Sequence, residues 1–252
     1  MRALAVVPTY NEAASVAELV RRALAADGRI ELLVVDDGSP DGTAALVKQL
    51  QAAEPRLHLL ERTAKQGLGA AYRAGFDWGL SRGFDVLLEM DADLSHPPER
   101  VPALLDAMGT ADVAIGSRYV PGGRTVNWSR ARAALSRAGN GYVRLALHLP
   151  VNDATAGFRA YRRAVLRTVG LESVQSNGYC FQVEMVHRAW REGFRVAEVP
   201  ITFTDRVAGE SKMDGRIVLE ALVRVTCWAL TGGRRRMRAR HPASVLAGSP
   251  TA

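Results

Sequence analysis

The first half of the chain alternates short apolar runs with amphipathic segments, and this alternation constrains the fold more than any other feature. The apolar runs span residues 3–7, 30–35, 57–60, 86–90 and 112–116. Segments with apolar residues at helical spacing follow the first four runs. This repeated order predicts an α/β domain with a Rossmann-like, mostly parallel sheet and helices on both faces.

The order becomes less regular after Arg118. There we expect a loop over residues 119–123, a long helix to about residue 149, a strand over 154–161, a helix over 179–191, a strand over 195–203 and a last helix over 216–230. We predict one domain, residues 1–231, and an Arg-rich, mostly disordered tail, residues 232–252.

Polar turns follow four of the expected strands. They are Pro-Thr-Tyr at 8–10, Asp-Asp-Gly at 36–38, Asp-Ala-Asp at 91–93 and Gly-Ser-Arg at 116–118. Ligands of open parallel sheets bind beyond the carboxyl ends of the strands, so we expect these turns to share one site. The chain lacks the glycine motif of dinucleotide-binding folds and the Walker lysine motif, which argues against a dehydrogenase and a P-loop enzyme.

Two carboxylates directly follow the apolar run Val86–Met90. Asp91 and Asp93 flank a small residue, Ala92, and can turn toward one hard cation. Mg²⁺ and Mn²⁺ prefer oxygen ligands, and an ion held by few protein oxygens keeps positions open for a diphosphate. The alternative is an ordinary polar turn without a metal.

Charge and cysteine content limit the partners. The net charge is +7, but five of these charges are arginines beyond Thr231, so residues 1–230 carry only +2. A short arginine tail without a nucleic-acid-reading module argues against nucleic acid as a partner. Cys180 and Cys227 lie far apart without ligand-like neighbours, which indicates reduced thiols and no zinc site.

The chain has no sequence feature typical of membrane insertion. No apolar run reaches the ~18–20 residues that span a bilayer, and Met1 leads almost directly into a strand, so we expect no transmembrane helix and no signal peptide. The segment from Trp128 to Leu149 mixes apolar and arginine residues. Such a helix either lies on a membrane surface or packs on the sheet with its arginines in solvent.

Seven motifs in order give the chain a family resemblance. They are VPTYNE (7–12), VDDGSPDGT (35–43), GLG (67–69), MDADLSHP (90–97), GSRY (116–119), TAGFR (155–159) and GESK (209–212). Together they resemble the polyprenol-phosphate (dolichol-phosphate) mannosyltransferases among the family-2 glycosyltransferases of GT-A fold. The resemblance covers about residues 5–230.

This resemblance implies a GDP-mannose site whose guanosine contacts are Pro8, Tyr10, Glu12, Val35 and Asp37. For Asp37, the alternative is that it caps the following helix. The resemblance also implies that Asp91, Ala92 and Asp93 contact the sugar diphosphate and a Mg²⁺ or Mn²⁺ ion. Ser95 stands where some relatives have glutamine and is the expected additional metal ligand.

The same resemblance implies phosphate-binding cations at Arg118, Arg132, Arg206 and Lys212, and an acceptor-phosphate site formed by Arg118, Arg132 and Ser136. Guanidinium groups suit phosphate because they form paired hydrogen bonds to its oxygens. The implied catalytic groups are Asp91, Asp93, Arg118 and Arg132.

The implied reaction transfers mannose from GDP-mannose to polyprenyl phosphate with inversion. A phosphate monoester is largely ionised at neutral pH, so we expect no strong general base, and we interpret His96 and Glu184 as structural. Two alternatives stay open: UDP-glucose as the donor, or a non-catalytic adaptor on anionic membranes. We expect a peripheral location at the cytoplasmic face of a membrane, reached directly or through a membrane-protein partner.

Overall fold

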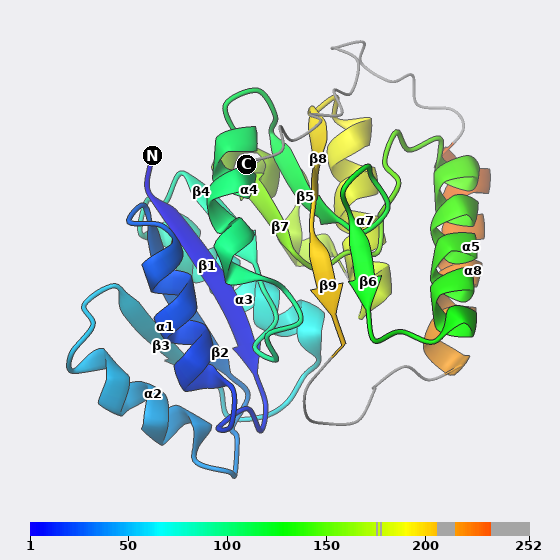
Figure 1. The fold of residues 1–252 in the computed structure, drawn as a ribbon. Helices are drawn as coiled ribbons and strands as arrows, with labels where there is room; N and C mark the ends of the chain where they lie inside the picture. The colour runs from blue at the N-terminus through cyan, green and yellow to red at the C-terminus, as the bar shows by residue number, and fades with distance from the viewer. Residues whose placement is uncertain (175, 177, 206–214, 233–252) are drawn as a thin grey trace.

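The computed structural model describes residues 1–174, 176, 178–205 and 215–232. Its main element is a seven-stranded sheet in the order β3-β2-β1-β4-β7-β5-β8 (Figure 1). The strands of this sheet are β1 (Ala3–Thr9), β2 (Ile30–Asp36), β3 (Leu57–Glu61), β4 (Val86–Glu89), β5 (Val113–Ser117), β7 (Arg159–Arg162) and β8 (Val196–Pro200).

All strand pairs of this sheet are parallel except those of β7, which runs antiparallel to both β4 and β5. The predicted mostly parallel α/β sheet is therefore confirmed. The expected strand over 154–161 was wrong in its first half, because residues 154–158 form a loop and only β7 joins the sheet. Periodicity alone does not give strand direction, so the antiparallel β7 was not predictable from its apolar pattern.

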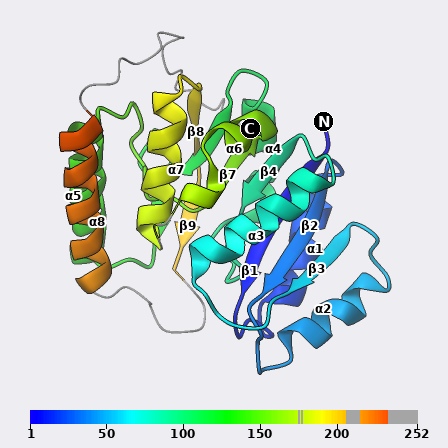
Figure 2. The same ribbon diagram turned by 180° about the vertical axis from the view of Figure 1, so that it is seen from behind.

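Helices cover both faces of the sheet. On one face lie α1 (Val16–Ala26), α2 (Thr43–Gln51) and α4 (Val101–Ala107), the last preceded by a short 3-10 turn (Pro98–Arg100). On the other lie α3 (Leu68–Ser81), α6 (Arg163–Thr168) and α7 (Tyr179–Arg191), which Figure 2 shows from the front; a second 3-10 turn (Leu171–Ser173) joins α6 to α7.

Helix α3 lies unusually close to the sheet because of a glycine. A Cβ atom at Gly75 would lie 2.3 Å from Val6 Cγ1, so no larger residue fits there without movement of the helix. This close packing fixes the start of α3 beside the carboxyl ends of β1 and β4, where the polar turns lie.

A second, two-stranded parallel sheet pairs β6 (Arg124–Val126) with β9 (Thr202–Thr204). The expected single strand over 195–203 is thus two strands, β8 and β9, in different sheets. Neither β6 nor α6 was predicted, because each is too short to show a clear period.

The remaining two helices, α5 (Arg130–Leu147) and α8 (Gly215–Gly232), lie side by side at the β8 end of the molecule (Figure 1). The inner side of α5 joins the core through Val143 and Leu147. Its arginines at 130, 137 and 144 are exposed. The inner side of α5 therefore fits the alternative of a helix that packs on the protein with its arginines in solvent. None of the helices in the described part of the chain is both long and apolar enough to cross a bilayer. The predicted tail, beyond Gly232, lies outside the described residues.

Candidate active site

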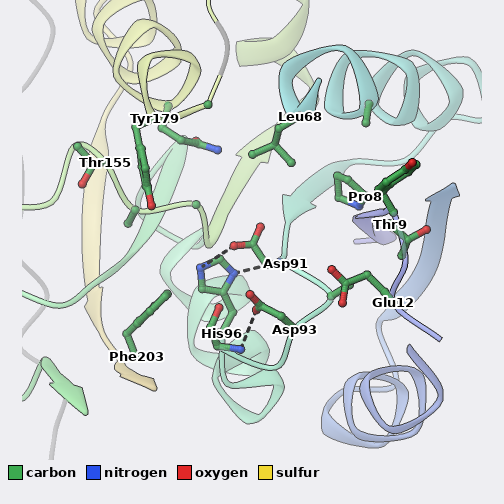
Figure 3. A pocket seen from close by; sticks show the side chains of 18 of the residues that line it. Pro8, Thr9, Glu12, Leu68, Asp91, Asp93, His96, Thr155, Tyr179 and Phe203 are labelled. Atoms are coloured by element: carbon green, nitrogen blue, oxygen red, sulfur yellow. Dashed lines mark hydrogen bonds and ion pairs between the residues drawn. The ribbon is translucent and has the colours of Figure 1, made fainter. Parts of the chain in front are cut away.

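A cavity of about 380 Å³ opens at the carboxyl ends of the parallel strands. All four polar turns contribute to its wall, through Tyr10, Asp37, Asp91 and Arg118 among others. The expectation that these turns share one site is therefore confirmed. Figure 3 shows the labelled side chains around this cavity, with Glu12 and Pro8 on one side and Thr155 and Phe203 on the other.

The turn after β2 is held by acids other than Asp37. Asp36 accepts hydrogen bonds from Thr9 Oγ1 (2.9 Å) and from the backbone N–H of Ser39 (2.8 Å). Asp41, not Asp37, accepts the N–H of Thr43 at the start of α2 (3.0 Å). The capping alternative for Asp37 is therefore wrong, and its carboxylate reaches the cavity wall.

Cations surround the Asp37 side of the cavity. Asp37 Oδ1 lies 2.8 Å from Arg62 Nη1, and Lys65 Nζ lies 4.0 Å from the centroid of the Tyr10 ring. Burial raises the pKa of Asp37, while the charge of Arg62 opposes this rise. A planar ring, a carboxylate and a lysine around one space suit a polar, aromatic ligand such as a nucleoside.

Four other predicted donor residues also line the cavity: Pro8, Glu12, Ala92 and Asp93. Val35 does not, because its side chain is wholly buried in the core and packs near Gly75. The implied contact of Val35 with the guanosine therefore stays a prediction. Arg206 and Lys212 lie outside the described residues.

The Asp-Ala-Asp turn is held by its own following residues. Leu94 has a left-handed backbone (φ 63°), which turns the chain back on itself. Asp93 Oδ1 accepts the backbone N–H of Ser95 (3.1 Å), and His96 Nδ1 accepts that of Asp91 (3.0 Å). A left-handed non-glycine residue is a conformation often found at functional turns.

Tyr72 holds the side chain of Asp91, and His96 holds its backbone. Since His96 Nδ1 accepts, the hydrogen of the neutral ring is on Nε2, 3.8 Å from Asp91 Oδ2. Tyr72 donates to Asp91 Oδ1 (3.3 Å), and burial together with the Asp91 charge raises the pKa of Tyr72, which keeps this donor protonated. His96 is itself fixed by stacking on Phe158 (5.3 Å between centroids). The structural interpretation of His96 is therefore refined: it orients Asp91.

A third acid, Glu89, lies behind Asp91 on β4 and is completely buried. Burial raises the pKa of Glu89 to about 8, although the charge of Arg159, its register partner on β7, opposes this rise. Glu89 is therefore largely neutral at pH 7. A neutral Glu89 adds no negative charge close to Asp91, so it does not disfavour the ionised form of Asp91.

The oxygen donors of this turn fit a hard divalent cation. The described part of the chain has no cluster of three acidic, histidine or cysteine side chains suited to a metal, and this turn contributes two carboxylates, Asp91 and Asp93, to the cavity wall. Mg²⁺ is commonly bound by one or two carboxylates together with substrate phosphates. The Ser95 hydroxyl is buried without a hydrogen-bond partner among the described groups, and Ser95 lines the cavity.

Arg118 is fixed in a buried ion pair with Asp153. Its Nε and Nη2 atoms donate to the two Asp153 oxygens (2.8 and 2.7 Å), and its backbone N–H donates to the same carboxylate (2.9 Å). The pair is nearly solvent-free, and the Asp153 charge keeps the pKa of Arg118 above its usual value despite burial. Arg118 also lines the cavity, so its planar guanidinium group is held at the cavity wall in one orientation.

Arg132, in the first turn of α5, lies between the cavity and a second hollow. Its Nη1 donates to Asp205 (2.6 Å), and its guanidinium lies 4.1 Å from the centroid of the Trp128 ring. The N–H of Arg132 is capped by Ser129. This ion pair is partly exposed, so an incoming anion can replace Asp205 at modest cost.

The second hollow is an apolar groove of about 140 Å³ between α5, α7 and α8. Arg118, Arg132 and Ser136 all line it, so the structure brings the three predicted acceptor-phosphate residues together. The Ser136 hydroxyl accepts a hydrogen bond from Tyr119 (2.6 Å). The apolar lining of the groove comes mainly from Leu135, Val143, Val183, Leu222 and Val225.

Sequence reasoning missed several residues of this site: Lys65, Tyr72, Trp128, Asp153, Tyr179 and Phe203. Asp153 is 35 positions from Arg118, and no local pattern marks the pair. Arg159, in the TAGFR motif, is wholly buried and donates to the carbonyls of Ala154, Ala156 and Gln182. It therefore stabilises the loop that forms one wall of the cavity.

Comparison with known proteins gives consistent matches. A family model described as glycosyl transferase family 2 matches residues 4–170. A polyprenol monophosphomannose synthase of Mycolicibacterium smegmatis is 53% identical over 94% of this chain and 90% of its own length. An undecaprenyl-phosphate mannosyltransferase of Micrococcus luteus is 52% identical over 95% of this chain and 99% of its own.

Among solved structures, a mannosyltransferase from Pyrobaculum calidifontis in complex with GDP-Man and Mn²⁺ shares the fold. The TM-score is 0.62 at 19% identity, over 93% of this chain and 66% of that one. The match extends through both the sheet that carries the cavity and most of the remaining chain.

Proposed function

Because this chain belongs to glycosyl transferase family 2, we propose that its cavity binds GDP-mannose and that its apolar groove binds the polyprenyl phosphate that accepts the sugar. One observation carries this assignment. Arg118 and Arg132 line both hollows, so a polar site and an apolar site meet at two guanidinium groups. Transfer of a sugar between a nucleotide and a lipid phosphate requires such a junction.

The class of enzyme is established by the relatives. The two relatives are 52 and 53% identical to this chain over nearly their full lengths, and both are named as enzymes of this class. The predicted polyprenyl-phosphate mannosyltransferase activity is therefore confirmed. The predicted GT-A, α/β fold is confirmed by the likeness to the Pyrobaculum enzyme. The identity of the donor nucleotide and the roles of individual residues are our proposals.

In the proposed reaction, an oxygen of the acceptor phosphate attacks C1 of mannose. The bond from C1 to the diphosphate oxygen breaks, and GDP leaves with the bonding electron pair, so the anomeric centre inverts. The acceptor is already an anion near neutral pH and needs no proton removed. This agrees with the cavity wall, where His96 is engaged in holding Asp91.

The main barrier is electrostatic, since two phosphate-bearing substrates must approach each other. Arg118 offers a fixed positive charge, because Asp153 holds its fork and leaves Nη1 without a hydrogen bond to any described residue. Arg132 exchanges Asp205 for the acceptor phosphate. Preorganised cations that cost little to reorient are effective in stabilising developing negative charge.

Asp91 and Asp93 would hold a Mg²⁺ or Mn²⁺ ion at the diphosphate. When bound, such an ion neutralises charge on the diphosphate and so improves the leaving group. The contribution of the protein is orientation: Tyr72 and His96 fix Asp91, and the N–H of Ser95 fixes Asp93. We keep Ser95 as a proposed third ligand, because its buried hydroxyl lies in the cavity wall and forms no hydrogen bond with a described group.

We further propose that the enzyme works as a peripheral protein at the cytoplasmic face of the membrane. The groove lies between α5 and α8, two helices at one end of the molecule that carry exposed apolar side chains. A lipid phosphate can then enter the groove from the bilayer. A membrane-protein partner could assist this contact.

The test is transfer of radiolabelled mannose from GDP-mannose to a short-chain polyprenyl phosphate in detergent, with and without a chelator. Asp93→Asn keeps the size of the side chain and should reduce transfer at least 100-fold, because a ligand charge is lost, while thermal unfolding stays close to wild type. UDP-glucose in place of GDP-mannose tests the alternative donor. Full turnover by Asp93→Asn, or no transfer by the wild type, would contradict the proposal.

A further inference from the structure

The outward side of α5 carries arginines and no acid. Arg130, Arg137 and Arg144 recur at intervals of seven residues, which places them on one stripe of the helix, and all three are exposed. The 18 residues of α5 contain no aspartate or glutamate. Unlike Arg118 and Arg132, these three arginines form no ion pair with a described carboxylate.

The surface formed by α5 and α8 also carries apolar side chains. Of the eight large hydrophobic side chains that are exposed in the described part of the chain, five lie on these two helices: Leu135, Leu145, Leu222, Val223 and Leu230. Thr226 of α8 is hydrogen-bonded to Tyr142 of α5 (2.6 Å), which ties the two helices into one surface. A helical surface that carries both arginines and exposed apolar side chains is typical of a protein that contacts anionic lipid.

Two of the three arginines border a hollow. A depression of about 150 Å³ is lined by Tyr119, Arg137, Asn140, Gly141, Arg144 and Asn152. The lining contains two guanidinium groups and no carboxylate. Arg130, one repeat earlier on the same stripe, does not line it.

The polar groups around this hollow are already oriented. Arg144 donates to Asn152 Oδ1 (3.1 Å), and the amide of Asn152 donates to Glu198 (2.9 Å). Glu198 is buried and also accepts the backbone N–H groups of Asn152 and Asp153, so it is engaged away from the hollow. The hydrogen bond to Asn152 thus fixes one nitrogen of the Arg144 guanidinium group, and its other N–H groups can donate to a ligand.

Tyr119 connects this hollow to the acceptor site. The guanidinium carbon of Arg118 lies 5.2 Å from the centroid of the Tyr119 ring, and that of Arg137 lies 5.4 Å from it. The Tyr119 hydroxyl donates to Ser136, which lines the acceptor groove. Tyr119 is therefore in contact with a cation of each site, Arg137 of the hollow and Arg118 of the acceptor groove.

We propose that the hollow between Arg137 and Arg144 binds the phosphate headgroup of an anionic membrane phospholipid, at a site separate from the acceptor site. This inference rests on the proposed function, because it assumes that the enzyme acts on a bilayer. The bound headgroup would hold the α5 and α8 surface against the membrane, with the mouth of the groove facing the lipid.

The experiment compares binding of the full-length protein to vesicles of phosphatidylcholine with and without phosphatidylglycerol. One arginine attracted only by the general surface charge contributes about fivefold in affinity. Arg130→Gln, the matched control outside the hollow, should lose about that much. Arg137→Gln and Arg144→Gln should each lose more than about tenfold, because each removes a direct, charged hydrogen bond to phosphate.

A fourth variant tests the hollow without a change of charge. A Cβ atom at Gly141 meets nothing within 4 Å, so Gly141→Gln fits the fold and fills the space. It should lower the preference for phosphatidylglycerol vesicles several-fold. Equal losses for the three arginine variants and none for Gly141→Gln would show diffuse attraction only and overturn the headgroup site.

Activity separates this inference from the proposed function. In detergent with a short-chain acceptor, Arg137→Gln and Arg144→Gln should transfer mannose with an unchanged KM for the acceptor. A raised KM would place the hollow within the acceptor site and contradict the proposal. Failure of the wild type to transfer mannose would refute the proposed function, whereas the vesicle series judges the headgroup site independently.

Discussion

Replacing Asp153 by asparagine tests whether the buried partner of Arg118 stabilises the fold and the site together. Both side chains are nearly inaccessible to solvent, and Asp153 accepts two guanidinium N–H groups and one backbone N–H. Removing one member of a buried ion pair leaves the other charge uncompensated, at a cost of about 3–5 kcal/mol. We expect Asp153→Asn to lower the free energy of unfolding by about this amount.

The matched control is the pair of Arg22 and Glu99. It has the same two-bond geometry (2.7 and 2.8 Å), but both side chains reach solvent. Glu99→Gln should cost less than about 1 kcal/mol, because water screens an exposed pair. Urea denaturation followed by tryptophan fluorescence measures both variants. Similar losses for the two would refute the idea that burial makes the Arg118 pair important.

Three further changes test the site. Arg132→Ala should raise the KM for polyprenyl phosphate about tenfold or more and that for GDP-mannose much less; equal increases would argue against an acceptor role. His96→Phe keeps the stacking on Phe158 but loses the acceptor for the Asp91 N–H, so it should need about fivefold more Mn²⁺ for half-maximal rate, whereas His96→Asn should restore much of the affinity. Burial lowers the pKa of His187 to about 4, with Arg191 adding to this, so the unfolded chain binds a proton at this position between pH 6.5 and 4 and the folded chain does not. Stability should thus fall as pH drops through this window, by roughly 1 kcal/mol per pH unit from His187, and His187→Gln should flatten the curve of unfolding free energy against pH; parallel curves would contradict this origin.

Local patterns were sufficient for most of the fold. Parallel strands buried on both faces need continuous apolar runs. The runs at residues 30–35 and 86–90 predicted β2 (Ile30–Asp36) and β4 (Val86–Glu89) to within one residue. The helix over 179–191 matched its prediction at both ends, although its burial is not periodic: nine of its residues are buried, and eight of these are consecutive. The prediction failed for a short strand and for an antiparallel one: β6 has only three residues, and β7 runs opposite to its neighbours in the sheet.

For the site, the residues that follow strands were predictable, whereas their partners were not. Asp91 and Arg118 follow apolar runs, and parallel topology brings such positions to one edge. Asp153, Tyr72 and the Arg137 hollow depend on contacts between segments far apart in the chain. No local pattern encodes such contacts.

The sequence by itself determined the alternation of strands and helices, the edge at which ligands bind and the family, because each depends on residues close together in the chain. The tertiary structure decided which charges are paired and which face outward. It placed Arg118 against Asp153 in the interior and left the stripe of Arg130, Arg137 and Arg144 exposed. Burial and pairing depend on what packs against each side chain, and only the folded chain fixes that.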